Sequence, residues 1–142
     1  YVETATTAAD RIRDAQAAIE RVNAIIKFRD DGAAVDVRAD GKTMADSLTS
    51  LLALFARPEV QGIGSESNTI AAKLDEAASY LEVVGRPAGQ GYEFALAHAV
   101  NKLSEALERL NTFFARDWNA YRLKVEDSQL SLFEDYAPIE PQ

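Results

Sequence analysis

The chain has 142 residues, 47% of them hydrophobic, and its 15 basic and 23 acidic residues give a formal net charge of −8. This length is typical of one domain, and the apolar fraction is high enough for a packed core, which argues against wholesale disorder. Because the chain has no cysteine, disulfide scaffolds, thiolate zinc sites and cysteine nucleophiles are excluded. The acidic balance argues against nucleic-acid binding. No apolar run reaches the roughly 18 residues of a membrane-spanning helix.

The chain begins with Tyr1, and no basic-then-apolar signal segment follows it. Nothing in these residues suggests a complete catalytic machine. The chain is therefore either a processed product or a fragment of a longer protein, and we expect the fragment.

The first predicted helix is about 22–26 residues long and carries a heptad pattern. Asp30-Asp31-Gly32 ends the pattern, as a glycine just past a helix commonly does. Because the apolar seam consists of small and branched residues, we expect a partner helix to approach closely. The seam residues recur in steps of three and four: Ala5, Ala8, Ile12, Ala15, Ile19, Val22 and Ile26.

The second helix is predicted to begin near Thr43. No helical period holds from residue 31 to residue 42, and Asp31-Gly32 and Asp40-Gly41 are typical turn dipeptides, so we predict an irregular connection there. Thr43 is the expected cap, and Pro58 is expected to end the helix. The apolar stripe is Met44, Leu48, Leu51, Leu52 and Phe55.

Two further helices complete the pattern. The third carries its apolar stripe on Ile70, Leu74, Ala77, Leu81 and Val84, and Gly85-Arg86-Pro87 is expected to close it. The fourth is the longest, from Tyr92 to Glu126, with a bend or a fresh start near Asp117, because Asp-Trp-Asn is a poor helix sequence. Its stripe is Leu96, Ala99, Val100, Leu103, Leu107, Leu110, Phe114, Trp118, Tyr121 and Val125.

These elements predict an all-α protein, an up-and-down four-helix bundle with a long fourth helix. Helices one and four are expected to be longer than two and three and to project beyond them. Residues 1–126 are assigned to the bundle, and residues 127–142 to an extended acidic tail that docks on the bundle or trails from it. From Glu126 onward the chain has five acidic residues and no basic one.

Candidate catalytic and metal-binding residues are few. His98 is the sole histidine, and we expect it to be solvated, because the sequence nominates no group to orient it as a general base. A di-iron bundle site needs Glu-x-x-His on two helices, which one histidine cannot supply. The stretch from Asp36 to Gly41 matches a calcium loop poorly, since Arg38 stands where an oxygen ligand belongs and Ser47 takes the twelfth position. We predict no catalytic residue, no metal site and no cofactor.

Aromatic residues gather near the end of the fourth helix and in the tail. At helical spacing such residues are typical of a core, and core packing is the favoured interpretation. The alternative is a partner interface, because large aromatic side chains often anchor protein contacts. The candidate interface residues are Phe113, Phe114, Trp118, Tyr121 and Phe133.

The order of these segments resembles a known family. Residues 12–29, with an Arg-Asp opening and an Asn…Arg close, resemble its first helix, and residues 68–81 resemble its third. Residues 87–92, 103–121 and 132–133 resemble its last helix and tail. The family is the C-terminal helical region of large bacterial sortilin-like proteins with Asp-box (BNR) β-propellers, which are glycosyl-hydrolase-like. The resemblance implies a periplasmic or secreted parent whose propeller and any glycan or peptide site lie elsewhere.

We predict a non-catalytic helical accessory or interaction domain. Its partner is another domain of the same parent chain or a separate protein, with no nucleic acid and no membrane span. The alternative is a stand-alone helical binding module for a partner protein or a small apolar ligand. An enzyme of the bundle-based hydrolase or metal-oxidase kind is the third hypothesis. An exposed apolar patch favours the first hypothesis, whereas an enclosed apolar cavity favours a ligand carrier.

Overall fold

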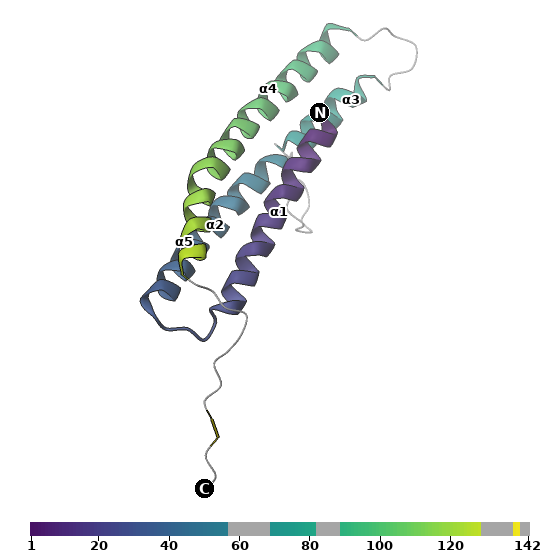
Figure 1. The fold of residues 1–142 in the computed structure, drawn as a ribbon. Coiled ribbons are helices and arrows are strands. Elements are labelled where there is room, and N and C mark those ends of the chain that lie inside the picture. The colour runs from purple at the N-terminus through teal and green to yellow at the C-terminus, as the bar shows by residue number, and fades with distance from the viewer. Residues whose placement is uncertain (57–68, 82–88, 129–137, 140–142) are drawn as a thin grey trace.

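The computed structural model describes residues 1–56, 69–81, 89–128 and 138–139. Within these ranges every regular element is helical, which confirms the predicted all-α helical bundle (Figure 1). None of the described helices has the length and apolar character that crossing a membrane requires. The elements are α1 (Val2–Ile25), α2 (Gly32–Phe55), α3 (Ile70–Ser79), α4 (Gln90–Phe113), the π-helical η1 (Phe114–Trp118) and α5 (Asn119–Asp127).

Helix α1 follows the predicted heptad. Six of the seven seam residues are buried, and Val22 is partly buried against the core. Alanine occupies three of these positions, so the backbone of a neighbouring helix can come close. Helix α1 accordingly packs along α2 for most of its length (Figure 1).

The predicted irregular connection over residues 31–42 is wrong, because α2 already begins at Gly32. Asp31 supplies the N-cap: its carboxylate accepts a hydrogen bond from the backbone N–H of Ala34 at 3.4 Å. Thr43 therefore lies inside the helix, where its hydroxyl donates to the carbonyl of Ala39 at 3.3 Å. Helices α1 and α2 are both 24 residues long, so the second helix is not a short one as expected.

Gly41 explains why the Asp40-Gly41 pair is not a turn. It is buried in the middle of α2, at the junction with α1 and α5. A Cβ atom placed on it would lie 3.4 Å from the hydroxyl oxygen of Tyr121 and 3.5 Å from a methyl carbon of Ile19. The glycine thus lets three helices approach one another, a use that sequence pattern does not distinguish from a turn.

Helix α3 pairs with α4 rather than with α2. Its N-cap is Thr69, whose side chain accepts from the N–H of Ala72 at 3.2 Å. It begins beside Phe55, at the end of α2, and ends where the ring of Tyr80 lies 3.8 Å from a Cβ atom placed on Gly91. Helices α2 and α3 therefore run in the same direction, one after the other along the bundle (Figure 1).

This arrangement changes which helices project. The start of α4 extends beyond the N-terminal end of α1 with α3 beside it, so the α3–α4 hairpin projects rather than the predicted pair of helices one and four (Figure 1). Helix α3 stops at Ser79, and Leu81, expected on its stripe, is 56% exposed. Pro58, Val84 and Gly85-Arg86-Pro87 lie outside the described residues.

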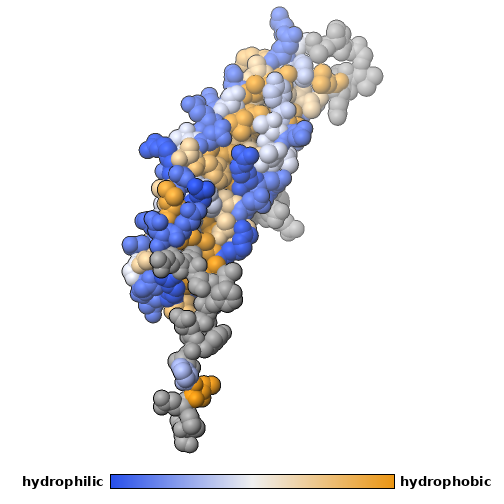
Figure 2. Space-filling model, viewed as in Figure 1, coloured by the Kyte–Doolittle hydropathy of each residue, from blue (hydrophilic) through white to orange (hydrophobic). Residues whose placement is uncertain are grey.

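Helices α4 and α5 form one rod through the π segment. The hydrogen-bonding pattern changes at Phe114–Trp118, which includes the position near Asp117 where the sequence predicts a bend or a fresh start. The rod ends at Asp127, and of the predicted tail after Ser128 only residues 138–139 are described. Along the bundle, Figure 2 shows a strip of hydrophobic side chains between hydrophilic borders.

Candidate functional site: a groove between α2 and α4

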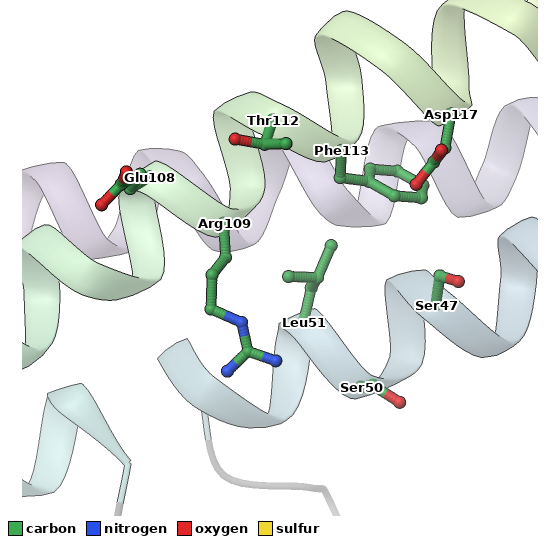
Figure 3. Close-up of a pocket in the computed structure, with 8 residues that line it drawn as sticks. All are labelled: Ser47, Ser50, Leu51, Glu108, Arg109, Thr112, Phe113 and Asp117. Atoms are coloured by element: carbon green, nitrogen blue, oxygen red, sulfur yellow. The ribbon is translucent and has the colours of Figure 1, made fainter.

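A groove of about 490 Å³ lies between α2 and the second half of α4 (Figure 3). Its floor is apolar, because Leu51 from α2 and Phe113 from α4 are the two lining residues that belong to the core. Polar and charged side chains from both helices form its borders. The residues that line it are Ser47, Ser50, Leu51, Glu108, Arg109, Thr112, Phe113 and Asp117.

The borders carry three charged side chains, Glu108, Arg109 and Asp117, and none of them has an ion-pair partner among the described residues. Arg109 lies toward one end of the groove and Asp117 toward the other, and Figure 3 shows the guanidinium extending toward α2. Glu105 precedes Arg109 by four residues, the spacing of a surface ion pair on a helix, but it accepts from Lys102 instead, at 3.5 Å. Arg109 and Asp117 are therefore both available to a ligand or partner.

The π segment places Asp117 on this face. Arg109 and Asp117 are eight residues apart, and in a regular α-helix eight residues overshoot two full turns by roughly 80°. A π turn takes more residues than an α turn, because its hydrogen bonds join residue i to i+5, so the overshoot is smaller. Both side chains thus border the same groove. Single-turn π segments inside α-helices occur frequently at functional sites.

The groove is better suited to recognition than to covalent chemistry. Its lining, all within the described residues, has no histidine, and its carboxylates belong to Glu108 and Asp117. Of its hydroxyls, that of Ser50 donates to the carbonyl of Asp46 at 3.1 Å, within its own helix. Across the described ranges no group of three His, Cys, Asp or Glu side chains lies close enough to hold a metal ion. An apolar floor between opposite charges favours binding of an amphipathic segment.

The predicted aromatic residues form a continuous file next to the groove. Neighbouring rings pack in edge-to-face or tilted geometry, with centroid distances of 5.4 Å from Phe113 to Phe114, 5.9 Å from Phe114 to Trp118 and 5.5 Å from Trp118 to Tyr121. Phe113 and Tyr121 are buried in the core, and Phe114 and Trp118 are partly buried against it. Phe133 lies outside the described residues. The file therefore offers a partner mainly Phe114 and Trp118, whereas Phe113, 6% exposed, contributes a small surface at the groove floor.

Tyr121 is the most unusual member of the file. Its side chain is buried, and within the described residues its hydroxyl has no hydrogen-bond partner. Burial raises the pKa of this phenol, and the negative charge of Asp40 raises the pKa further. The hydroxyl stays protonated at neutral pH and lies against Gly41 and α1 as a packing group.

The other sequence candidates lie away from this groove. His98 is exposed on α4, as expected. The calcium-loop stretch from Asp36 to Gly41 is helical, so its carboxylates do not encircle a cation. The sequence pattern did not identify Arg109 and Asp117 as a pair. The signal that could have found them is two opposite charges on either side of Phe113, next to the weak helix sequence Asp-Trp-Asn.

No family model matches the chain, and searches of curated proteins and of solved structures found no match either. The resemblance to the helical region of sortilin-like proteins therefore stays a prediction from the sequence. The groove geometry carries the functional interpretation that follows.

Proposed function

We propose that this chain is a non-catalytic helical interaction domain that binds a helix of a partner protein in the α2–α4 groove. The observation that carries the proposal is the pair of unpaired charges, Arg109 and Asp117, at the two ends of an apolar floor. Along the helix they lie about 12 Å apart, a spacing of two turns. An amphipathic helix in this groove contacts Leu51 and Phe113 with its apolar side and each charge with an opposite one.

The partner is either another domain of a longer parent chain, as the resemblance to the propeller-containing family implies, or a separate protein. The groove is open to solvent, as a helix-binding surface requires. The alternative, a carrier of a small apolar ligand, has weaker support. The hollow among α1, α2 and α3, lined in part by Ala5, Phe55 and Leu74, has a volume of about 180 Å³, and the larger hollow of about 530 Å³ beside Val35 and Ala45 is open to solvent rather than enclosed. Pockets for drug-sized ligands usually measure about 300–1,000 Å³.

Photo-crosslinking in the cells that produce the protein tests the proposal. A photoreactive amino acid replaces Ser50, which borders the groove, and in a matched control it replaces Ser79, an exposed serine on α3. Both hydroxyls bond to a carbonyl in their own helix, so the two changes cost similar local contacts. We expect a discrete crosslinked partner from position 50 and not from position 79, identified by mass spectrometry.

Adding Arg109→Asp to the position-50 variant is expected to reduce crosslinking severalfold, because the partner's acidic group then meets a like charge. Identical products from the two positions, or no product from position 50, would contradict the proposal. Insensitivity of the product to Arg109→Asp would show that the partner binds elsewhere.

A further inference from the structure

We infer that the helix received by this groove is α4 of a second copy of this chain, which makes the groove a two-fold homodimer interface. This inference rests on the proposed function and names the partner of the same site. It is carried by the spacing of the groove charges around one residue.

The charges are symmetric about Phe113. Arg109 lies four residues before Phe113, and Asp117 lies four residues after it. If two copies of α4 cross in antiparallel orientation at Phe113, Arg109 of each copy stands opposite Asp117 of the other. A two-fold axis produces both ion pairs at once, because every contact in such an interface occurs twice. An unrelated partner would need two charges of the right sign at this spacing, whereas a second copy supplies them by symmetry.

The two ion pairs depend on the π segment, which places Arg109 and Asp117 on the same side of the helix. Without it, Arg109 and Asp117 would lie roughly 80° apart around the helix, and a single antiparallel neighbour would not meet both. In the structure both residues border the groove. Neither has an ion-pair partner within its own chain among the described residues, so neither must give up a partner to bind a second copy.

The groove also fits the helix that would enter it. In a rhombic arrangement, α4 of each copy lies over the α2–α4 groove of the other. Leu51 and Phe113, 8% and 6% exposed, then lie beneath the crossing point, and the groove borders supply most of the contact. The borders contributed by α2 are Ser47 and Ser50, whose small side chains permit close approach. Edge-to-face packing with Phe114, at 5.4 Å between centroids, holds the Phe113 ring in place.

The flanking charges follow the same symmetry. Glu108, the remaining charged residue of the lining, has its carboxylate directed away from Arg109 (Figure 3). Arg116 is exposed on the other side of the crossing point and likewise has no ion pair within the described chain. These two residues lie five positions before and three positions after Phe113, so the antiparallel crossing brings Glu108 of one copy near Arg116 of the other.

Two effects limit the expected strength of the dimer. The paired charges are largely exposed, and each such pair contributes little, while each copy carries a net charge of −8 that repels the other. We therefore expect a dimer that forms with increasing concentration rather than a permanent one. Sedimentation velocity of the full chain should show a species of twice the 15.5 kDa chain mass that grows with protein concentration.

Charge reversal provides the decisive experiment. Arg109→Asp leaves each groove with three acids and no base, and Asp117→Arg leaves each groove with two bases and Glu108, so either variant alone is expected to raise the dimer dissociation constant at least about tenfold. An equimolar mixture of the two variants restores both ion pairs between unlike chains, and its dissociation constant should return to within about threefold of wild type. The double variant Arg109→Asp with Asp117→Arg should also dimerise, because it exchanges the signs but keeps the pairs.

Arg122→Asp is the matched control. It produces the same change of charge at an exposed residue of α5, whose ion pair at 3.7 Å is with Glu126 of the same helix, and it should leave the dissociation constant unchanged. Circular dichroism of each variant checks that the helical content is retained. Recovery in the mixture cannot arise from a folding defect, because neither chain changes its own sequence on mixing.

Three outcomes would overturn the homodimer: a monomer at all concentrations, equal dimerisation of both single variants and wild type, or a mixture that fails to recover. These results are distinguishable from failure of the proposed function. A monomer that still crosslinks to another protein from position 50 keeps the interaction domain and removes the homodimer. A crosslinked species of twice the chain mass supports both proposals, and no crosslink from position 50 in either form removes both.

Discussion

The two ends of the bundle differ in how completely they bury the apolar side chains of their helices. At one end the close of α1, the start of α2 and α5 meet, and Ile26, Ala34 and Val37 are each 0% exposed. At the other end α3 lies against the start of α4, where Phe94 is 79% exposed and Leu81 is 56% exposed. Phe28 is 83% exposed at the first end, but it lies in the turn after α1 rather than on a helix. On the helices the difference lies in their neighbours, because the start of α2 packs against both α1 and α5, whereas the start of α4 packs against α3.

Side-chain to backbone hydrogen bonds reinforce the closed end. Arg29 donates to both carboxylate oxygens of Asp31 at 2.8 Å and also reaches the carbonyl of Ser128, at the end of α5, at 3.4 Å. Arg38 donates to the carbonyls of Ile26 and Arg29 at 3.0 Å. These bonds join the connection after α1, the start of α2 and the end of α5 through backbone carbonyl groups. We infer that the closed end contributes most of the global stability, and that the α3–α4 end opens locally at lower cost.

The largest expected effect comes from removing a buried side chain at the closed end. Ile26→Ala should lower the free energy of unfolding by about 2–5 kcal/mol, because it leaves a cavity in a fully buried position. Phe94→Ala removes a larger side chain at the open end but should change stability by no more than about 0.5 kcal/mol. Urea denaturation followed by circular dichroism measures both. Equal losses from the two variants would show that the ends do not differ.

A second test targets the close approach of helices at Gly41. Gly41→Leu should cost about 1–3 kcal/mol, because its branched side chain has no space between α1 and α5. Gly41→Ala should be neutral or stabilising by up to about 1 kcal/mol, since its Cβ atom would lie at ordinary contact distances of 3.4 and 3.5 Å and alanine favours a helix interior. Thermal unfolding of the two variants separates these effects. If alanine destabilises as much as leucine, the glycine is needed for backbone conformation instead.

Sequence pattern predicted what depends on residues close together in the chain. The heptad of α1 was readable because every seam residue follows the last by three or four positions. The start of α2 was misread because Gly41 and the Asp40 before it have turn character locally. The role of Gly41 comes from Ile19 and Tyr121, which are distant in sequence.

The groove was less predictable than the bundle for the same reason. Phe113 was identified as a candidate interface residue and does line the groove, yet the spacing of Arg109 from Glu105 favours a surface pair that the structure does not form. Whether Arg109 and Asp117 share a face depends on the π segment, and regular helical spacing places them on different faces. The unfavourable Asp-Trp-Asn sequence marked the place where the helix becomes π-helical, but it did not indicate that Asp117 would lie on the side of the groove.

The smallest expected effect on stability comes from removing the hydrogen bonds of Arg29, and the size of this effect should depend on pH. The side-chain hydrogen bond from Arg29 lowers the pKa of Asp31 from its usual 3.8, so this contact stabilises the folded chain above that pH and weakens as pH falls through the lower, folded-state value. Arg29→Met should therefore reduce the free energy of unfolding slightly at neutral pH, and the difference from wild type should narrow in acid as Asp31 becomes protonated. The part of this difference in free energy of unfolding that persists in acid comes from the hydrogen bonds to the carbonyl of Ser128, which does not titrate.

Arg13→Met is the matched control for that measurement, because Arg13 bonds to Asp10 at 3.1 Å within α1 and connects no second helix. Exposed pairs of this kind contribute little, so the control should match wild type in urea denaturation at both pH values. If Arg29→Met also matches wild type at neutral pH, the closed end owes its stability to buried residues such as Ile26 alone. If the difference in free energy of unfolding widens in acid, protonated Asp31 stabilises the folded chain more than the carboxylate does. The hydrogen bond from Arg29 is then not what couples α1 to α2.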